Sequence, residues 1–472
     1  MLFTEPVFLF LFLPVLLGLY FAPRAREHGR YGNWVLLLAS ILFYAKGGGS
    51  FTGLMLGSIT FNYWMAIGVD RTRGTRLCRP LLVFAVAANL AVLGVFKYLN
   101  FFADNLHVPL PRIVLPIGIS FYTFHAISYV VDVYRRDAVA QKSPVHAGLY
   151  LLLFPQLIAG PIIRYRELAD QLARRVVGLD DFAYGIRRFV VGLAKKLLVA
   201  NLVAAPADRI FSMPPGQWSA AHAWLGIVCY TLQIYFDFSG YSDMAIGLGR
   251  LFGFRFPENF RYPYVATSIQ DFWRRWHISL SAWFRDYLYV PLGGNRGSAA
   301  RTYVNLVIVF FLCGLWHGAS WNFAVWGLFH GAFLVIERLG VAGWMERRWA
   351  PLRHVYVLLV VMVGWVFFRA DTLPQATAYL AAMAGLGAAL PTPYAPAYYL
   401  TPELWLALVA GVIGATPILA IVARWRALQA PGRPLPAAAW ATAETAAVAV
   451  LMVASMMQVA ARTYDPFIYF RF

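Results

Sequence analysis

The sequence predicts an all-α protein that crosses a membrane many times, and three observations lead to this fold class. First, 60% of the 472 residues are hydrophobic and only 13% are charged, whereas a soluble domain carries roughly 25% charged residues. Second, the mean hydropathy is +0.60. Third, many apolar runs approach or reach the roughly 17–25 residues of a spanning helix. We expect about 11–13 transmembrane or re-entrant helices in one membrane domain that covers residues 1–472.

Each expected helix is an apolar window between polar or charged residues. Two of the windows, 221–250 and 302–337, are long enough to form two pieces each. In chain order, the expected spanning or re-entrant segments are 7–22, 33–46, 52–69, 80–96, 113–134, 145–163, 182–205, 221–250, 302–337, 354–370, 374–390, 402–423 and 436–460.

The loops between the first helices alternate in charge and predict the orientation of the chain. Basic loops at 24–30, 70–79 and 134–142 alternate with loops near 47–51 and 100–111 that carry little charge. Basic loops of membrane proteins face the cytoplasm. The rhythm therefore predicts an N-terminus on the outer face of the membrane.

The formal net charge of +18 comes from 40 Lys and Arg residues against 22 Asp and Glu. In a membrane protein such an excess belongs to cytoplasmic loops, so we expect contact with membrane lipid and none with nucleic acid. Three scattered cysteines, Cys78, Cys229 and Cys313, form neither a disulfide framework nor a metal pair. No phosphate-binding loop or dinucleotide fingerprint occurs, so no bound cofactor and no metal are expected.

The apolar run 221–250 carries polar groups that are unusual inside a membrane. The stretch "YFDFSGYSDMAIGLGRLFGF" (235–254) contains Asp237 and Asp243 among aromatic residues and glycines. Intramembrane carboxylates usually line a cavity or pair with a basic residue. Both aspartates are therefore candidates for the lining of a cavity, and the pattern leaves their partners open.

The stretch "SIQDFWRRWHISLSAWFRDY" (268–287) predicts one amphipathic helix at the cytoplasmic interface, because its large apolar residues recur at spacings of three and four. His277 lies beside the apolar stripe, while Arg274 and Arg275 fall elsewhere. Two interpretations stay open for this helix: it anchors lipid headgroups and only packs His277, or it belongs to a functional site.

The apolar run 302–337 has basic residues at both flanks, so it is expected to enter the membrane and return. Its natural break is "CGLWHGAS" (313–320), which contains His317. An ascending arm of about 14 residues rises roughly 21 Å in a hydrocarbon layer of about 30 Å, so His317 should lie deep. An imidazole at that depth is by default functional; the alternative is a hydrogen bond between helices. For His330 and His125 we favour packing.

The last elements determine where the C-terminus lies. "RWRALQAPGR" (424–433) is predicted to be cytoplasmic, so the run 436–460 crosses outward and the tail 464–472 emerges on the outer face. This tail ends in "DPFIYFRF", which is rich in aromatic residues, and Tyr469 is its reactive group. An apolar tail of this kind is expected to occupy a pocket.

Five long motifs resemble those of the membrane-bound O-acyltransferase family. They are "PIGISFYTFHAISYVVDVYR" (116–135), "FPQLIAGPIIRYREL" (154–168), "YFDFSGYSDMAIGLG" (235–249), "FWRRWHISLSAWFRDYLYVPLGGNR" (272–296) and "GLWHGASWNFAVWGLFHG" (314–331). The resemblance implies a ring of helices around a tunnel that joins both membrane faces, with catalytic roles for His317 and His277. The bacterial branch that acylates polysaccharides or teichoic acid also has a histidine at the second position.

The resemblance further implies an O-acyltransferase that uses a cytoplasmic thioester donor such as acetyl-CoA. It implies a periplasmic partner, similar to Ser-His-Asp esterases, that delivers the group to a polysaccharide such as alginate. A related system has a separate subunit with a similar tail, whose tyrosine is proposed to carry the acyl group. Tyr469 is then the expected acyl carrier, or else the tail is an aromatic plug or a motif that docks a partner. Arg274, Arg275, Trp276 and Trp316 are candidates for donor or tunnel contacts.

Other functions remain open at this point. The acceptor polymer could be cellulose, peptidoglycan or teichoic acid instead. Many spans with broken helices and buried polar groups also mark transporters, and a scaffold that only recruits a periplasmic enzyme is a third class. The histidine of the "WHG" segment together with the tyrosine tail favours the enzyme, because a transporter needs no nucleophile.

Overall fold

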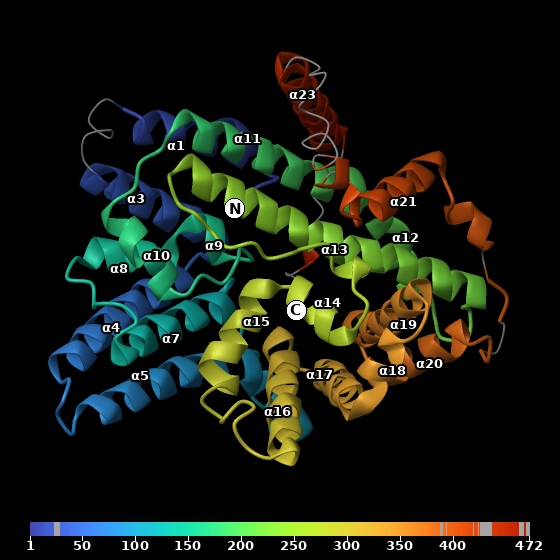
Figure 1. The fold of residues 1–472 in the computed structure, drawn as a ribbon, viewed down its shortest axis with the longest axis horizontal. Helices are drawn as coiled ribbons and strands as arrows, with labels where there is room; N and C mark the ends of the chain where they lie inside the picture. Colours follow the sequence, from blue (N-terminus) through green and yellow to red (C-terminus); the bar gives the residue numbers. More distant parts are fainter. Residues whose placement is uncertain are drawn as a thin grey trace. The chain divides into compact units, whose positions relative to one another are not determined.

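The computed structural model describes residues 1–22, 29–387, 390–392, 394–418, 420–422, 424, 437–461 and 467–468. Throughout these ranges the only regular secondary structure is helix (Figure 1), so the prediction of an all-α protein is confirmed. Six described helical stretches are long and apolar enough to span a membrane: Cys78–Asn105, Leu179–Phe211, Ala299–His317, Trp321–Glu346, Ala350–Arg369 and Ala439–Ala461. The protein therefore passes the membrane several times.

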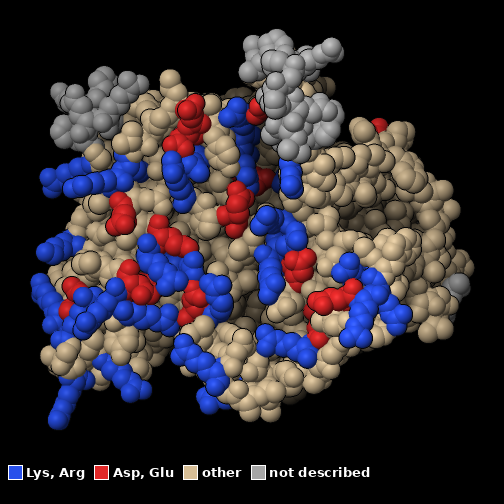
Figure 2. Space-filling model, in the orientation of Figure 1, with Lys and Arg blue, Asp and Glu red and all other residues tan. Residues whose placement is uncertain are grey.

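The surface carries the basic excess that the sequence contains. Figure 2 shows more Lys and Arg than Asp and Glu on the face that it draws, with broad areas of uncharged residues between them. Such a distribution suits a membrane protein, because uncharged surface can face lipid and basic side chains can face anionic headgroups.

The chain folds into two compact units. The first unit comprises Met1–Phe189 and Tyr241–Glu258, and the second comprises Val190–Gly240 and Asn259–Phe472. Two helices, α11 (Leu179–Ala194) and α13 (Ala220–Leu251), contribute residues to both units. Continuous helix through 220–251 shows that the predicted run 221–250 is one piece.

The first unit is built mainly from helices that pack on α4, α5 and α7. Its elements are η1 (Phe8–Phe12), α1 (Leu13–Tyr20), α3 (Gly29–Gly48), α4 (Phe51–Arg71), α5 (Cys78–Leu93), η2 (Gly94–Tyr98), α6 (Leu99–Asn105), α7 (Ile119–Arg135), α8 (Pro144–Leu152), α9 (Phe154–Leu157) and α10 (Tyr165–Ala173). Between α4 and α5, Asn62 and Asn89 exchange two side-chain hydrogen bonds of 3.0 and 2.7 Å. This reciprocal pair satisfies amide groups that have no water to bind inside a membrane.

The expected spanning or re-entrant segment 145–163 is not one continuous helix, because the chain leaves the helix after α8. The backbone of Leu153 is non-helical, and Pro155 lacks an N–H group that could continue the ladder. The break is supported from elsewhere, since the Phe154 N–H donates to Ser40 Oγ at 3.1 Å. Non-helical backbone in a membrane protein is tolerated where the protein itself provides such partners.

His125 belongs to the support of this irregular segment. Its Nε2 accepts a hydrogen bond of 3.3 Å from the Ile163 N–H, and the Tyr150 hydroxyl donates to Ile163 O at 3.0 Å. Both ring systems are fully buried. The structure therefore gives His125 the packing role that we favoured from the sequence.

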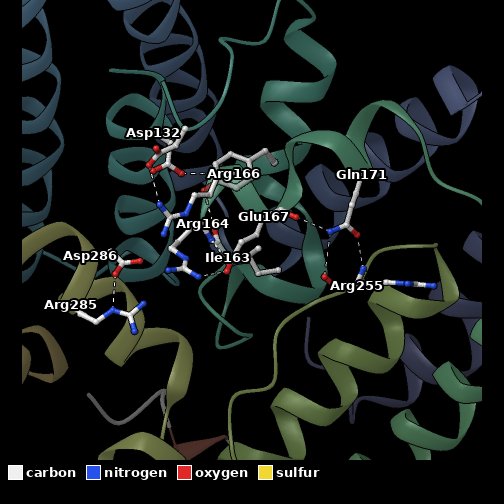
Figure 3. Close-up of polar contacts among 11 residues, drawn as sticks. Asp132, Ile163, Arg164, Arg166, Glu167, Gln171, Arg255, Arg285 and Asp286 are labelled. Atoms are coloured by element: carbon white, nitrogen blue, oxygen red, sulfur yellow. Dashed lines mark hydrogen bonds and ion pairs between the residues drawn. The ribbon is translucent and has the colours of Figure 1, made fainter. Parts of the chain in front are cut away.

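Polar contacts then fix the start of α10 (Figure 3). Arg164 and Glu167 form a capping pair, and the Arg166 N–H donates to Asp132 Oδ2 at 3.1 Å. Further along α10, Gln171 Oε1 accepts a bond of 2.7 Å from the Arg255 N–H. These bonds tie the motif "FPQLIAGPIIRYREL" into the first unit.

The second unit carries the histidine-bearing helices. Its elements are η3 (Lys195–Ala200), α12 (Asn201–Phe211), η4 (Pro263–Val265), α14 (Ile269–Arg275), α15 (Ile278–Phe284), η5 (Arg285–Tyr289), α16 (Ala299–His317), α17 (Trp321–Ile336), η6 (Glu337–Val341), α18 (Ala342–Glu346), α19 (Ala350–Arg369), α20 (Leu373–Met383), η7 (Pro396–Tyr399), α21 (Pro402–Gly414) and α23 (Ala437–Ala461). Helix α17 packs on α16, α19 and α14 (Figure 1). Of the two alternatives for the segment 374–390, spanning or re-entrant, α20 is too short for the first, since it has 11 residues and is about 16 Å long.

Candidate active site

The break between α16 and α17 lies where the sequence predicted it, directly after His317. The two helices approach backbone to backbone, because Gly314 and Gly327 leave no side chain between them. A Cβ atom on Gly314 would lie 2.1 Å from Phe323 O, and one on Gly327 would lie 2.3 Å from Phe310 O. This close packing fixes the end of α16 and therefore the position of the His317 side chain.

His317 is buried among aromatic rings. The ring centroids of Trp316, Trp326 and Phe368 lie 5.0, 5.1 and 5.2 Å from that of His317. His317 also lines a small pocket of about 10 Å³, close to the volume that one water molecule needs. Its other lining residues are Ile234, Phe238, Trp276, Trp326, Trp365, Phe368 and Ile468. The walls are apolar, so the imidazole is the reactive group of the pocket.

The predicted continuous helix 268–287 is wrong, because it breaks at Trp276 and His277. Trp276 is extended, and His277 has the left-handed backbone angles φ +44° and ψ +54°. A residue with a Cβ adopts this conformation at a cost of about 1–2 kcal/mol, so a partner outside the helix must stabilise it. That partner is Asn259, whose backbone oxygen accepts the Ile278 N–H at 2.9 Å.

The Asn259 side chain also decides the protonation of His277. Asn259 Oδ1 accepts from the Ser279 N–H at 3.2 Å and from the Ser279 hydroxyl at 2.9 Å, and it lies 3.1 Å from His277 Nδ1. A backbone N–H can only donate, so this atom is the amide oxygen and Nδ1 must carry the proton. Burial lowers the pKa of His277 to about 3, which keeps the ring neutral. Its Nε2 is a buried acceptor that has no hydrogen-bond partner among the described residues.

The structure brings the two predicted histidines into the same unit, around shared aromatic neighbours. The Trp316 ring lies 6.3 Å from that of His277 and 5.0 Å from that of His317. The Phe238 ring lies 4.6 Å from that of His277 and lines the pocket of His317. Trp276 lines the same pocket. Trp276 and Trp316 thus lie beside the two histidines.

Part of the C-terminal tail is seated in this site. Phe467 and Ile468 are 2% and 3% exposed, and Ile468 lines the pocket of His317. The Ile468 N–H donates to Asp237 Oδ2 at 2.7 Å, and Lys196 forms an ion pair of 2.5 Å with Asp237. Tyr469, the expected acyl carrier, lies outside the described residues.

The other predicted polar residues separate into different settings. Asp243 belongs to the first unit, where Arg188 pairs with it at 2.7 Å and with Glu258 at 2.6 Å. Its role there is an ion-pair network. His330 is fully buried between the rings of Trp273 and Trp326, the packing role that we favoured.

Arg274 and Arg275 also differ. Arg275 pairs with Asp271 at 2.9 Å, whereas Arg274 lines a second cavity of about 220 Å³ together with Arg285 and Arg338. The inner part of this cavity is apolar and includes Cys313, which precedes His317 by one turn of α16, or about 6 Å. Arg274 and Arg338 form no ion pair with any residue in the described ranges.

Two residues of this site were missed from the sequence. Lys196 lies inside the apolar run 182–205, and a lysine in such a run is itself a signal of function. Asn259 carries no comparable signal, because a polar residue in a loop is ordinary. Only its distance to His277 reveals its role.

Comparison with known proteins gives consistent similarities. Residues 141–368 match the model of the family described as MBOAT, membrane-bound O-acyltransferase family. The "Probable alginate O-acetylase AlgI" of Pseudomonas putida is 41% identical, with all of both chains covered. The protein of the same name from Azotobacter vinelandii is 48% identical over 82% of this chain and 79% of its own. The "Peptidoglycan O-acetyltransferase" of Helicobacter pylori is 37% identical over 82% of this chain and 80% of its own.

Proposed function

This chain belongs to the membrane-bound O-acyltransferase family, and from that premise we propose that it moves an acetyl group across the membrane for the O-acetylation of alginate. The membership confirms the resemblance drawn from the sequence motifs, and the protein is an O-acyltransferase. The acetyl group comes from a cytoplasmic thioester, with acetyl-CoA as the donor. Alginate is the favoured acceptor because similar proteins carry the name of an alginate O-acetylase.

One observation carries the proposed mechanism: the chain's own tail enters the pocket of His317. Ile468 lines that pocket, and the next residue in the sequence is Tyr469. Consecutive Cα atoms are about 3.8 Å apart, so the Tyr469 side chain is within reach of the same pocket. We assign the role of acyl acceptor to its hydroxyl and the role of general base to His317.

The transfer then proceeds in two steps. An unperturbed phenol has a pKa near 10 and an imidazole one near 6.5. His317 takes the Tyr469 proton while the phenol oxygen attacks the thioester carbonyl. The new C–O bond forms, the C–S bond breaks, and the thiolate receives the proton back from His317. The resulting phenyl ester keeps a good leaving group, so a hydroxyl on the outer side can take the acetyl group and regenerate Tyr469.

His277 has a different role because of its tautomer. Its Nδ1 proton is bound to Asn259, so Nε2 can only accept a hydrogen bond. It therefore does not polarise the thioester carbonyl. We propose that it accepts a bond from an amide N–H or the thiol of the donor and so aligns the thioester.

The second cavity fits the other end of the donor. Arg274 and Arg338 offer positive charge at its exposed rim, and its apolar interior leads toward Cys313. Guanidinium groups bind phosphates well, and a pantetheine thioester combines phosphates with a long, weakly polar arm. We assign this cavity to the donor, with Arg274 as a phosphate contact. Arg275, held by Asp271, serves the local structure.

The remaining parts of the proposal concern location and partners. The protein lies in the bacterial inner membrane with both termini on the outer side, since the alternation of basic loops supports this orientation. A periplasmic Ser-His-Asp esterase-like partner carries the acetyl group from the phenyl ester to the polymer. Peptidoglycan is the second candidate acceptor, because one relative is named for it.

Mass spectrometry of purified protein tests the carrier role directly. With acetyl-CoA that carries a labelled acetyl group, the C-terminal peptide of the wild type should gain one acetyl group on Tyr469. The variants Tyr469→Phe and His317→Ala should gain none while inserting into the membrane normally. Acetyl transfer at the wild-type rate by Tyr469→Phe would refute the proposal. O-acetyl analysis of alginate and peptidoglycan from cells with and without the protein identifies the acceptor.

A further inference from the structure

The tail is held by a buried ion pair that no part of the proposed chemistry uses. The side chains of Lys196 and Asp237 are 6% and 2% exposed, and their charged atoms lie 2.5 Å apart. Lys196 lies in η3, a π-helical turn, and such turns are frequent at functional sites. Next to it, a Cβ atom on Gly240 would lie 2.8 Å from Gly192 O. The helices that carry the ion pair are thus packed backbone to backbone, so its position is fixed.

The carboxylate of Asp237 divides its two oxygens between different partners. Oδ1 faces Lys196 Nζ, and Oδ2 accepts the Ile468 N–H at 2.7 Å. Lys196 Nζ also lies 5.7 Å from the centroid of the Phe467 ring, in reach of a cation–π contact. The ion pair therefore contacts both described tail residues: Lys196 lies near the Phe467 ring, and Asp237 binds the Ile468 N–H.

Asp237 binds the backbone of the tail, through the Ile468 N–H, and not a tail side chain. A buried N–H without a partner is costly, so the tail is most stable in the register that puts the Ile468 N–H on Oδ2. A slip by one residue would exchange this donor for a neighbouring N–H and would replace each seated residue by its neighbour in the sequence, whose Cα atom is about 3.8 Å away. Under the proposed function, a displacement of that size would prevent the Tyr469 hydroxyl from meeting His317.

We propose that Asp237, held in place by Lys196, is the positioning residue that sets the register of the C-terminal tail. This inference rests on the proposed function of Tyr469, because register matters only if that residue must meet His317. Asp237 acts through the tail and touches no reacting atom. Lys196 neutralises the carboxylate, which would otherwise be an unpaired charge in an apolar interior.

Two double variants distinguish the role of Asp237 as the anchor of the tail from a role in the stability of the fold. Lys196→Met with Asp237→Asn removes both charges but keeps an oxygen that can accept the Ile468 N–H. Lys196→Met with Asp237→Leu removes both charges and the acceptor, with a side chain of the same size. Neither leaves an unpaired buried charge, so both are expected to fold. They differ in the side-chain amide at position 237, whose oxygen can accept the Ile468 N–H.

Hydrogen exchange of the Ile468 amide in the full chain, resolved by mass spectrometry, is the primary measurement. Exchange should be slow in the wild type and in the Asn variant, and about tenfold or more faster in the Leu variant. The kcat for acetylation of Tyr469 should fall about 10²-fold in the Leu variant while the KM for acetyl-CoA stays unchanged. Equal exchange in the Asn and Leu variants would overturn the proposal.

A second pair of variants keeps the test decisive if the helix variants fold poorly. Ile468→Pro removes the N–H, and Ile468→Ala keeps it while shortening the side chain. The inference expects a larger loss of kcat from proline than from alanine, and the reverse order contradicts it. The results also distinguish a failure of the carrier role of Tyr469 from a failure of the anchor role of Asp237. Absence of an acetyl group on wild-type Tyr469 refutes the carrier role without changing the exchange result, whereas acetylated Tyr469 with equal exchange refutes only the anchor.

Discussion

Alanine at Gly314 should damage the reaction without any change of a reactive group. The added Cβ atom would start 2.1 Å from Phe323 O, and real Cβ atoms essentially never approach closer than 3.0 Å. Helices α16 and α17 must therefore separate by about 0.9 Å or more, which is the difference between these two distances. The separation would occur three residues before His317 on α16. Because the neighbour is backbone, no side-chain rotation can relieve the contact.

The structure gives the size of the effect. A misplacement of about 1 Å can cost roughly 10²-fold in rate, and overpacking of this kind costs about 1–3 kcal/mol of stability. We expect Gly314→Ala to insert into the membrane but to acetylate Tyr469 about 10²-fold more slowly. Single-turnover acetylation, followed by mass spectrometry of the C-terminal peptide, measures this rate.

The matched control is Gly57→Ala. Gly57 is an exposed residue of α4 with no atom within 4 Å of an added Cβ, so the same substitution meets open space and improves helix propensity. It should leave the acetylation rate unchanged. If Gly314→Ala acetylates at the wild-type rate, then close helix contact does not position His317 and the reasoning fails.

Three further predictions concern the surroundings of the histidines. Asn259→Ala removes the amide oxygen that faces His277 Nδ1 and accepts from Ser279, and it should lower the free energy of unfolding by about 3–5 kcal/mol. Denaturant titration in micelles checks this, and an unchanged midpoint would contradict it. Burial lowers the pKa of His277, so the stabilisation by its neutral ring is fully present above the pKa of about 6.5 in the unfolded chain and is lost as pH falls toward 3. In a pH series of melting curves, the His277→Gln variant should therefore be less sensitive to acid than the wild type. An identical pH dependence of the two proteins would argue against a neutral buried ring. Arg274→Gln should raise the KM for acetyl-CoA about tenfold with kcat nearly unchanged. The control Arg347→Gln should leave the KM unchanged, because Arg347 does not line the cavity. Equal KM values in the two variants would show that Arg274 does not belong to the donor site.

Much of the fold could be predicted because membrane helices obey local rules. Apolar length and the polarity of the flanks were enough for the class and for many of the helices. The break after His317 was also predictable, since glycines and polar residues interrupt the run 302–337 there. The physical basis of this break is the contact of Gly314 with the Phe323 backbone, and glycine is the residue that permits such a contact.

The errors share a different cause. The run 268–287 has perfect helical spacing, yet a loop residue eighteen positions away, Asn259, holds the left-handed turn at His277. The helix expected at 145–163 ends because Ser40 binds the Phe154 N–H over a separation of 114 residues. The pairing of Asp237 with Lys196 likewise joins distant parts of the chain. Periodicity within one segment carries no information on partners of this kind.

The attachment of the seated tail residues, Phe467 and Ile468, to the enzyme's own chain changes how the site can be inhibited. A tethered segment presents itself at an effective concentration of the order of millimolar, set by its linker and independent of the protein concentration. A free peptide with the sequence of residues 462–472 would have to exceed that level before it competed for the site. Compounds directed at the donor cavity would not compete with Phe467 or Ile468, neither of which lines it.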